Sequence, residues 1–336
     1  MFPYSAQKGY DGMNLIEEAV IIEVLGIRMY AFGACVALGV LFAVISLCVT
    51  GRHLSFKKGT ALLTAVISIL SGILCSRVAF CLLNKELGHM TPLSFWPQVS
   101  GGGWSMFGLI GGVLIGGYIS ARIMKEDTGK VLDAVSLSVL PMIAAERMGE
   151  SRIEDFDISR PLDSAFLKDS FLAVGGDEPC LATYYIAAAV AVLLFIILAV
   201  RMSHRERSGN IANAFLLLFG AASIITESLR YDRFLSVSFV GLQQIAAALT
   251  LAAGVVFAIV RGDRKPALWT AAAVSLVLMV GAVIGLEFAL DRTTWNKILI
   301  YVAMILIVVI PVILGMKLLK THNNKKGRVN YDDRQC

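Results

Sequence analysis

The chain has 336 residues, of which 57% are hydrophobic and only 16% are charged, and its mean hydropathy is +0.73. This composition excludes a water-soluble domain of such length, so the chain is predicted to be an integral membrane protein. The net charge of +5 does not require nucleic acid, because basic cytoplasmic loops give membrane proteins such an excess. We therefore expect no nucleic-acid partner.

Nine apolar runs are long enough to cross a hydrocarbon core, which takes roughly 20 residues of helix. In chain order they are Met29–Thr50, Gly59–Leu83, Met106–Met124, Val131–Met148, Ala182–Arg201, Ile211–Glu227, Val240–Val260, Leu268–Leu290 and Ile298–Leu319. The predicted fold is an all-α, polytopic membrane bundle of about nine transmembrane helices. The N-terminus lacks the basic segment and cleavage site of a signal peptide, so the first run is expected to stay in the protein.

Basic residues follow every second run, as at Arg52, Lys125, Arg205 and Arg264, whereas the intervening segments are acidic or nearly balanced. The positive-inside rule then places the N-terminus outside and the C-terminus inside, which an odd number of spans satisfies. Residues 1–28 are expected to form an extracytoplasmic segment. The polar residues 321–336 are expected to form a solvated, disordered cytoplasmic tail.

Charged residues gather at the predicted outer ends of the fourth and sixth runs. Arg147 lies near the outer end of the fourth, with Glu150 and Glu154 on the same face if the helix continues, and Glu227 with Arg230 lies near the outer end of the sixth. A charge at a helix centre costs about 2.5 to 3.5 kcal/mol on insertion scales, and less near the interface. These residues therefore either line a polar cavity or form salt-bridged helix ends at the headgroup boundary.

Glycines mark the approach to the third run and one face of the run itself. Gly108, Gly112 and Gly116 have the GxxxG spacing that lets membrane helices pack closely. The triplet 101–103 leads directly into a helix N-terminus, where free backbone N–H groups bind anions, and lipid phosphate is the available anion. The alternative is a flexible loop.

Ordered motifs extend over roughly residues 22–260. They are IRMYAFG around Tyr30, CSRVAF around Arg77, GGWSMFGLIGG from Gly102, LDAVS with Asp133, ERMGE from Glu146, TYY from Thr183, TESLRYDR around Glu227 and GLQQIAA from Gly241. The chain resembles the prolipoprotein diacylglyceryl transferase family. The resemblance implies a seven-helix core over 29–260, with two additional helices over 261–320.

The resemblance also implies an activity and a location. Such an enzyme, in the bacterial cytoplasmic membrane, moves a diacylglyceryl group from phosphatidylglycerol to the cysteine thiol of a lipobox-containing prolipoprotein and releases glycerol phosphate. Arginine suits the phosphate because its planar fork donates bidentately and stays charged. The implied catalytic residues are Arg147 and Arg230. The implied substrate-binding residues are Tyr30, Gly102, Gly103, Ser105 and Glu227.

The chain departs from the family pattern at three positions. Phe107 stands where the family has a histidine, Glu150 where it has an asparagine, and Ile186 where it has a glutamate. The cysteine thiol, with a reference pKa of about 8.5, still needs a base, and Glu150 or Glu154 is the catalytic candidate for that role. The alternative is that these carboxylates only pair with Arg147 or with a neighbouring arginine.

Three functions follow from these observations. The first is the transferase, and the second is a catalytically impaired paralogue that binds phospholipid or assists assembly in the membrane. The third, a transporter, predicts repeated halves and interrupted helices near the midplane, which the sequence does not show. No metal or other cofactor is predicted, because the six cysteines form no CxxC pair and no P-loop is present.

Overall fold

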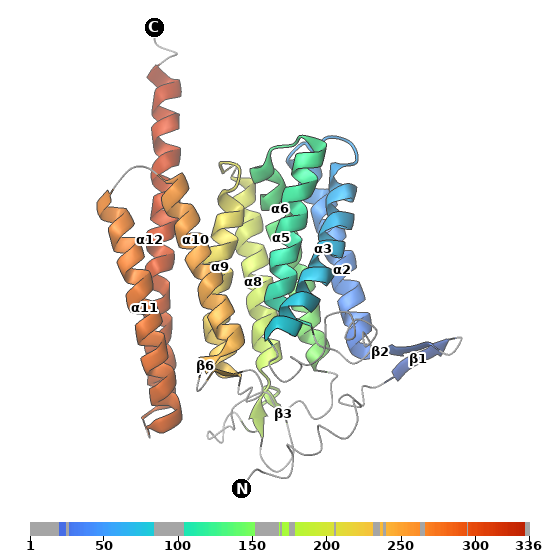
Figure 1. Ribbon diagram of the computed structural model, residues 1–336, viewed down its shortest axis with the longest axis vertical. Helices are drawn as coiled ribbons and strands as arrows, with labels where there is room; N and C mark the ends of the chain where they lie inside the picture. Colours follow the sequence, from blue (N-terminus) through green and yellow to red (C-terminus); the bar gives the residue numbers. More distant parts are fainter. Residues whose placement is uncertain are drawn as a thin grey trace.

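The computed structural model describes residues 20–24, 27–83, 104–151, 168, 170–174, 179–204, 206–230, 236–237, 240–262, 266–293 and 295–332. Within these residues, nine helices are long and apolar enough to cross a membrane. The chain is therefore a polytopic helical membrane protein, as the hydropathy pattern predicts. Figure 1 shows the helices standing side by side along one common direction.

The helices begin and end within a few residues of the predicted runs, except at the C-terminal end of the last. They are α2 (Ala31–His53), α3 (Thr60–Leu83), α5 (Met106–Met124), α6 (Thr128–Glu150), α8 (Thr183–Ser203), α9 (Asn210–Leu229), α10 (Leu242–Arg261), α11 (Pro266–Arg292) and α12 (Lys297–Asp332). Among the described residues, three short antiparallel strand pairs accompany them: β1 (Val20–Val24) with β2 (Ile27–Tyr30), β3 (Ala173–Val174) with β4 (Cys180–Leu181), and β5 (Ser236–Val237) with β6 (Val240–Gly241).

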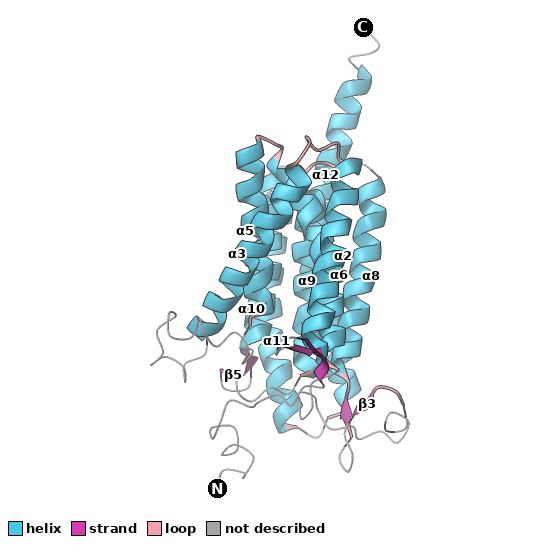
Figure 2. Cartoon of the chain, turned by 90° about the vertical axis from the view of Figure 1, so that its right-hand side faces the viewer, coloured by secondary structure: helices cyan, strands magenta, loops and turns pink. Residues whose placement is uncertain are grey.

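The structure corrects both ends of the predicted helical region. Tyr30 is the last residue of β2 rather than part of the first span, because the preceding chain pairs as a hairpin in which Val20 opposes Tyr30. The β1 sequence VIIEV is rich in β-branched residues, which favour extended chain. At the other end, α12 continues to Asp332, so most of the tail expected to be disordered is helical. Figure 2 shows α12 projecting at the end of the bundle opposite the strands.

In the part of the chain that the structure describes, three hydrophobic clusters hold the helices together, and α9 takes part in two of them. Side chains of α2, α3, α5 and α6 form the first, and those of α5, α6, α8 and α9 form the second. The third joins α9 and α10 to α11 and α12. One face of α9 thus packs against the earlier helices and the other against α10, α11 and α12.

Helices α3 and α5 approach closely at the glycine face predicted from the GxxxG spacing. A Cβ atom added at Gly108 would lie 2.6 Å from Ala79 Cβ, so only glycine fits there. The backbones are close enough for Ser71 Oγ to donate to Gly112 O at 2.8 Å. Small residues thereby fix the N-terminal end of α5, which reaches the candidate site, against α3.

Polar contacts join α6, α9 and α10 at the end of the bundle that the loop charges predict to be cytoplasmic. Buried Asp133 on α6 accepts hydrogen bonds from Gly209 N at 2.6 Å and Ala212 N at 2.7 Å. These N–H groups belong to the start of α9 and have no carbonyl partner within that helix. Asp133 thereby anchors the first turn of α9 to α6, and Arg261 Nη2 on α10 adds a 2.6 Å bond to Ser208 O.

Asp127 caps α6 at the same end. Its carboxylate accepts from Gly129 N at 2.8 Å and from Ser208 Oγ at 2.9 Å. Partial burial acts to raise the pKa of Asp127, but the hydrogen bonds from Ser208, Gly129 and Lys130 outweigh it, helped by the Lys130 charge. The pKa of Asp127 therefore lies below its ordinary value, and the ionised cap stabilises the fold.

Candidate active site

Arg147 occupies the last turn of α6, at the end of the bundle that the loop charges predict to lie outside. Its side chain is only 4% exposed and lies among acidic groups of its own helix. Nη1 donates to Glu150 Oε1 at 2.7 Å, and Nε lies 3.6 Å from Glu146 Oε2. The guanidinium group is thus held by two carboxylates before any contact with another helix.

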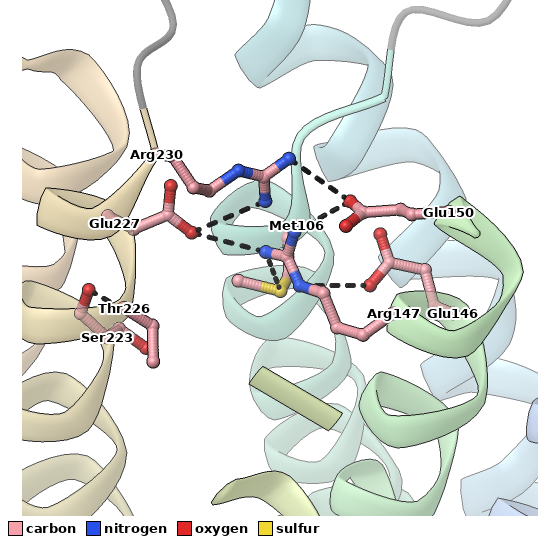
Figure 3. A network of polar contacts seen from close by, with 8 residues as sticks. All are labelled: Met106, Glu146, Arg147, Glu150, Ser223, Thr226, Glu227 and Arg230. Atoms are coloured by element: carbon pink, nitrogen blue, oxygen red, sulfur yellow. Dashed lines mark hydrogen bonds and ion pairs between the residues drawn. The ribbon is translucent and has the colours of Figure 1, made fainter. Parts of the chain in front are cut away.

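A second helix brings two more charges to the same place. Glu227 lies on the last turn of α9, and Arg230 is the C-cap residue of that helix. Glu227 Oε1 lies 3.3 Å from Arg147 Nη2 and 3.8 Å from Arg230 Nη1. Arg230 Nη2 lies 3.3 Å from Glu150 Oε1, so both arginines share that oxygen (Figure 3).

The start of α5 closes the site from a third side. Arg147 Nη2 contacts Met106 Sδ at 3.0 Å, and Met106 is the first residue of α5. Ser105 is the N-cap of this helix and accepts from Gly108 N at 3.2 Å. Ser76 Oγ on α3 donates to the Ser105 carbonyl at 2.8 Å, which fixes the entry of the chain into α5.

The network of Arg147, Glu146, Glu150, Glu227 and Arg230 combines burial with an uneven count of charges. Apart from Glu146, which is 23% exposed, each side chain is at most 10% exposed. Three carboxylates face two guanidinium groups, so the fully ionised network carries one negative charge. Buried ion pairs offset their loss of hydration only when the geometry is good and the remaining polar atoms are bonded.

A small pocket lies directly below Arg147, on the side of the bundle interior. Its lining includes Ile143 one turn earlier on α6, Ala187 and Ala191 on α8, and Ser223 on α9. The space open to the centre of a water molecule is about 20 Å³, roughly what one ordered water needs. The site is therefore closed in this structure, with carboxylates against the arginines and a largely apolar lining beneath.

Two aromatic residues lie at the start of α5, and one of them packs against the wall of this pocket. Phe107 packs in a tilted arrangement against Phe219, which lines the pocket, with 6.2 Å between the ring centroids. The guanidinium carbon Cζ of Arg77 lies over the Trp104 ring, 5.1 Å from the ring centroid. Arg77 is 2% exposed and comes from α3, so a further buried arginine lies next to the entry of α5.

The structure brings together four of the residues proposed from the sequence: Arg147, Arg230, Glu150 and Glu227. Ser105 caps α5 at the edge of the site, and Tyr30 ends β2 just before α2. Glu154, Gly102 and Gly103 lie outside the described residues.

Sequence reasoning did not assign Glu146 or Met106 to the site. Glu146 could have been found as the direct neighbour of Arg147, whereas the thioether contact of Met106 has no pattern in the sequence. Across the ranges that the structure describes, no group of three or more His, Cys, Asp and Glu side chains is arranged to hold a metal ion.

These features define a class, the polytopic membrane proteins with a buried arginine–glutamate network at one end of a helical bundle. The sequence profile of the prolipoprotein diacylglyceryl transferase family matches residues 19–260. The chain belongs to this family. The match covers the helices from α2 to α10 and ends before α11 and α12.

Two curated relatives are similar to the chain over most of their own length. The phosphatidylglycerol–prolipoprotein diacylglyceryl transferase of Clostridium tetani is 25% identical over 244 residues, which cover 70% of this chain and 94% of the relative. The enzyme of the same name from Clostridioides difficile is 24% identical over 216 residues, which cover 64% of this chain and 84% of the relative. These identities make the chain a divergent member.

Proposed function

We propose that this protein transfers a diacylglyceryl group from phosphatidylglycerol to the lipobox cysteine thiol of prolipoproteins, at the outer face of the bacterial cytoplasmic membrane. The observation that carries the proposal is the convergence of Arg147 and Arg230, from two helices, on the single oxygen Glu150 Oε1. Guanidinium groups so arranged suit one oxyanion, and family membership supports lipid phosphate as that oxyanion.

The phosphate takes the place that carboxylates hold in the closed site. A phosphodiester oxygen offers Arg147 and Arg230 the same acceptor chemistry as Glu150 Oε1. Glu150 is the residue to be displaced, because it is the last residue of α6 and the chain leaves the helix directly after it. Glu227, on the last turn of α9, contacts both guanidinium groups and remains in place to orient them.

The pocket beneath Arg147 suits the apolar part of the same lipid. Its walls on α8 are small residues, Ala187 and Ala191, and the polar side chains of Ser223 and Thr226 lie on the α9 wall. A headgroup at the arginines would place the glyceryl carbons at the mouth of this pocket. The pocket must widen to receive them, because it now has room for about one water.

The transfer exchanges one bond at carbon for another. The cysteine sulfur forms a bond to the glyceryl carbon that carries the phosphate oxygen, and the carbon–oxygen bond breaks. Glycerol phosphate leaves with the electron pair, and the two arginines stabilise the charge that develops on it. The thiol proton passes to a base, and Glu150 is the proposed base once the phosphate has displaced it. Glu154 is the alternative base.

A second function, phospholipid binding without catalysis, is favoured by one observation. Phe107 packs against Phe219 at the position where the family has histidine, so the bundle is built around an aromatic side chain there. Such a protein keeps the arginines that hold phosphate but lacks an imidazole base. The two functions differ only in whether the bound lipid reacts.

The test uses the purified full-length protein in nanodiscs that contain phosphatidylglycerol, together with a lipobox peptide. We expect the peptide to gain the mass of one diacylglyceryl group, with release of one glycerol phosphate. Arg147→Ala should abolish both signals, whereas Arg122→Ala, an exposed arginine at the opposite end of α5, should keep them. Bound phosphatidylglycerol without product would establish the second function instead.

A further inference from the structure

The two helices beyond the family match share a hydrophobic core with the helix that carries half of the site. Met279 on α11 and Met304 on α12 are fully buried in the same cluster as Ile224 on α9. Figure 1 shows α11 and α12 standing next to α10 on one side of the bundle. The apolar contacts alone would make these helices a packing partner, but polar contacts add a more specific role.

The first polar contact joins α11 to α9 through α10. Glu287, five residues before the end of α11, is 3% exposed and accepts a hydrogen bond from Gln244 Nε2 at 2.8 Å. The same amide nitrogen donates to the carbonyl of Ile224 at 3.3 Å. Ile224 lies one turn before Glu227. A buried carboxylate in an apolar helix is costly, so its presence at this place calls for a function.

The second contact joins α12 directly to the last turn of α9. Tyr301 OH donates to Ser228 O at 3.2 Å, and Ser228 follows Glu227 in the chain. The last four carbonyls of a helix lack partners within the helix, and in a membrane they need partners from elsewhere. Tyr301 supplies one to the turn that ends at the C-cap Arg230.

We infer that α11 and α12 hold the outer end of α9 in register with Arg147, so that Glu287 and Tyr301 are positioning residues of the headgroup site. Both contacts reach α9 within one turn of Glu227, and Arg230 follows as the C-cap. Arg147 is carried by α6, which packs on the opposite side of α9. The distance between the two arginines therefore depends on how α9 is held. The role in lipid binding rests on the proposed function.

The test compares hydrogen–deuterium exchange and lipid dependence in the full-length protein. Tyr301→Phe removes only the hydroxyl group, and Glu287→Ala removes the acceptor, whereas Glu287→Gln keeps an oxygen acceptor. We expect amides of residues 223–230 to exchange about three- to tenfold faster in the first two variants, the range that one membrane hydrogen bond supports. Glu287→Gln should restore slow exchange. Tyr118→Phe, on the half-exposed face of α5, is the control and should leave it unchanged.

Transfer kinetics show whether this positioning reaches the headgroup. In nanodiscs with a varied fraction of phosphatidylglycerol, Tyr301→Phe should raise the KM for the lipid about three- to tenfold and leave the KM for the peptide unchanged. A loss of active protein alone would lower kcat and leave both KM values as they are, and that result would overturn the inference. Unchanged exchange at residues 223–230 would overturn it as well, even if the protein proves inactive as a transferase.

Discussion

Arg147 on α6 and Glu227 on α9 are 80 residues apart in the chain, yet Arg147 Nη2 lies 3.3 Å from Glu227 Oε1. The contact joins two helices at the end of the bundle through side chains that are 4% and 7% exposed. Each of these buried charges has lost its hydration, and the opposite charge of the partner offsets that cost. The pair therefore links the stability of the bundle to the geometry of the proposed site.

A double-mutant cycle should reveal this dependence. Arg147→Ala alone is expected to destabilise the protein by about 3 to 5 kcal/mol, because it leaves three carboxylates to share the single cation Arg230. In the double variant with Glu227→Ala, the loss of unfolding free energy should be smaller than the sum of the losses in the two single variants. The expected coupling energy is about 1 to 3 kcal/mol. Unfolding in detergent measures each variant. Additive losses would mean that the two side chains do not interact.

The identity of the base can be tested by removing the carboxylate of Glu150 and introducing an imidazole at Phe107. Glu150→Gln keeps a hydrogen-bond acceptor for the arginines but cannot take a proton, so transfer should fall by about 100-fold or more. Adding Phe107→His to this variant should raise the transfer rate by at least about tenfold, since it places an imidazole beside the pocket. Phe107→His alone serves as the control for lost packing against Phe219. A fully active Glu150→Gln variant would favour Glu154 as the base.

Two adjacent glycines of α5 provide a matched test of the contact with α3. A Cβ at Gly112 would lie 2.8 Å from both Cys75 Cβ and Gly72 Cα, whereas a Cβ at Gly111 meets no atom within 4 Å. Gly112→Ala should therefore destabilise the bundle by about 1 to 3 kcal/mol. Gly111→Ala should be neutral or slightly stabilising because alanine favours helix. Equal melting temperatures for the two variants would contradict the packing seen here.

The α6 cap should make stability depend on pH. Because the pKa of Asp127 is lower in the folded protein than its ordinary value, the ionised carboxylate favours folding. This stabilisation is present above about pH 4 and is lost as the pH falls through the lowered pKa. At pH 7 the melting temperature of Asp127→Asn should thus be lower than that of the unmodified protein. The difference between the two melting temperatures should shrink at acidic pH. A constant difference would mean that the charge plays no part.

Hydropathy was sufficient to predict the nine spans, because each membrane helix needs its own long apolar run. The hairpin of β1 and β2 escaped prediction, since its β-branched residues continue directly into the first apolar run. The helical extension of α12 to Asp332 was also missed, because a polar composition alone does not distinguish a solvated helix from a disordered tail.

The candidate site was predictable to a different degree. Helical spacing places Glu150 beside Arg147, but only the ordered family motifs indicated that Arg230 belongs with them. The link from Glu287 to Gln244 was missed, although a lone carboxylate inside an apolar run is a signal that sequence reasoning can use. Which partner it meets depends on how α10 and α11 pack, and no local pattern encodes that.

Under the proposed function, the excess of one carboxylate over the guanidinium groups has a consequence for the binding of phosphatidylglycerol. A phosphodiester arrives as a monoanion, so its entry into a fully ionised network would double the uncompensated charge in a poorly hydrated place. Electroneutrality then demands that a proton enter with the lipid or that an acid side chain move out to water. Binding of the lipid therefore displaces or neutralises one carboxylate. The affinity for phosphatidylglycerol should accordingly rise as the pH falls.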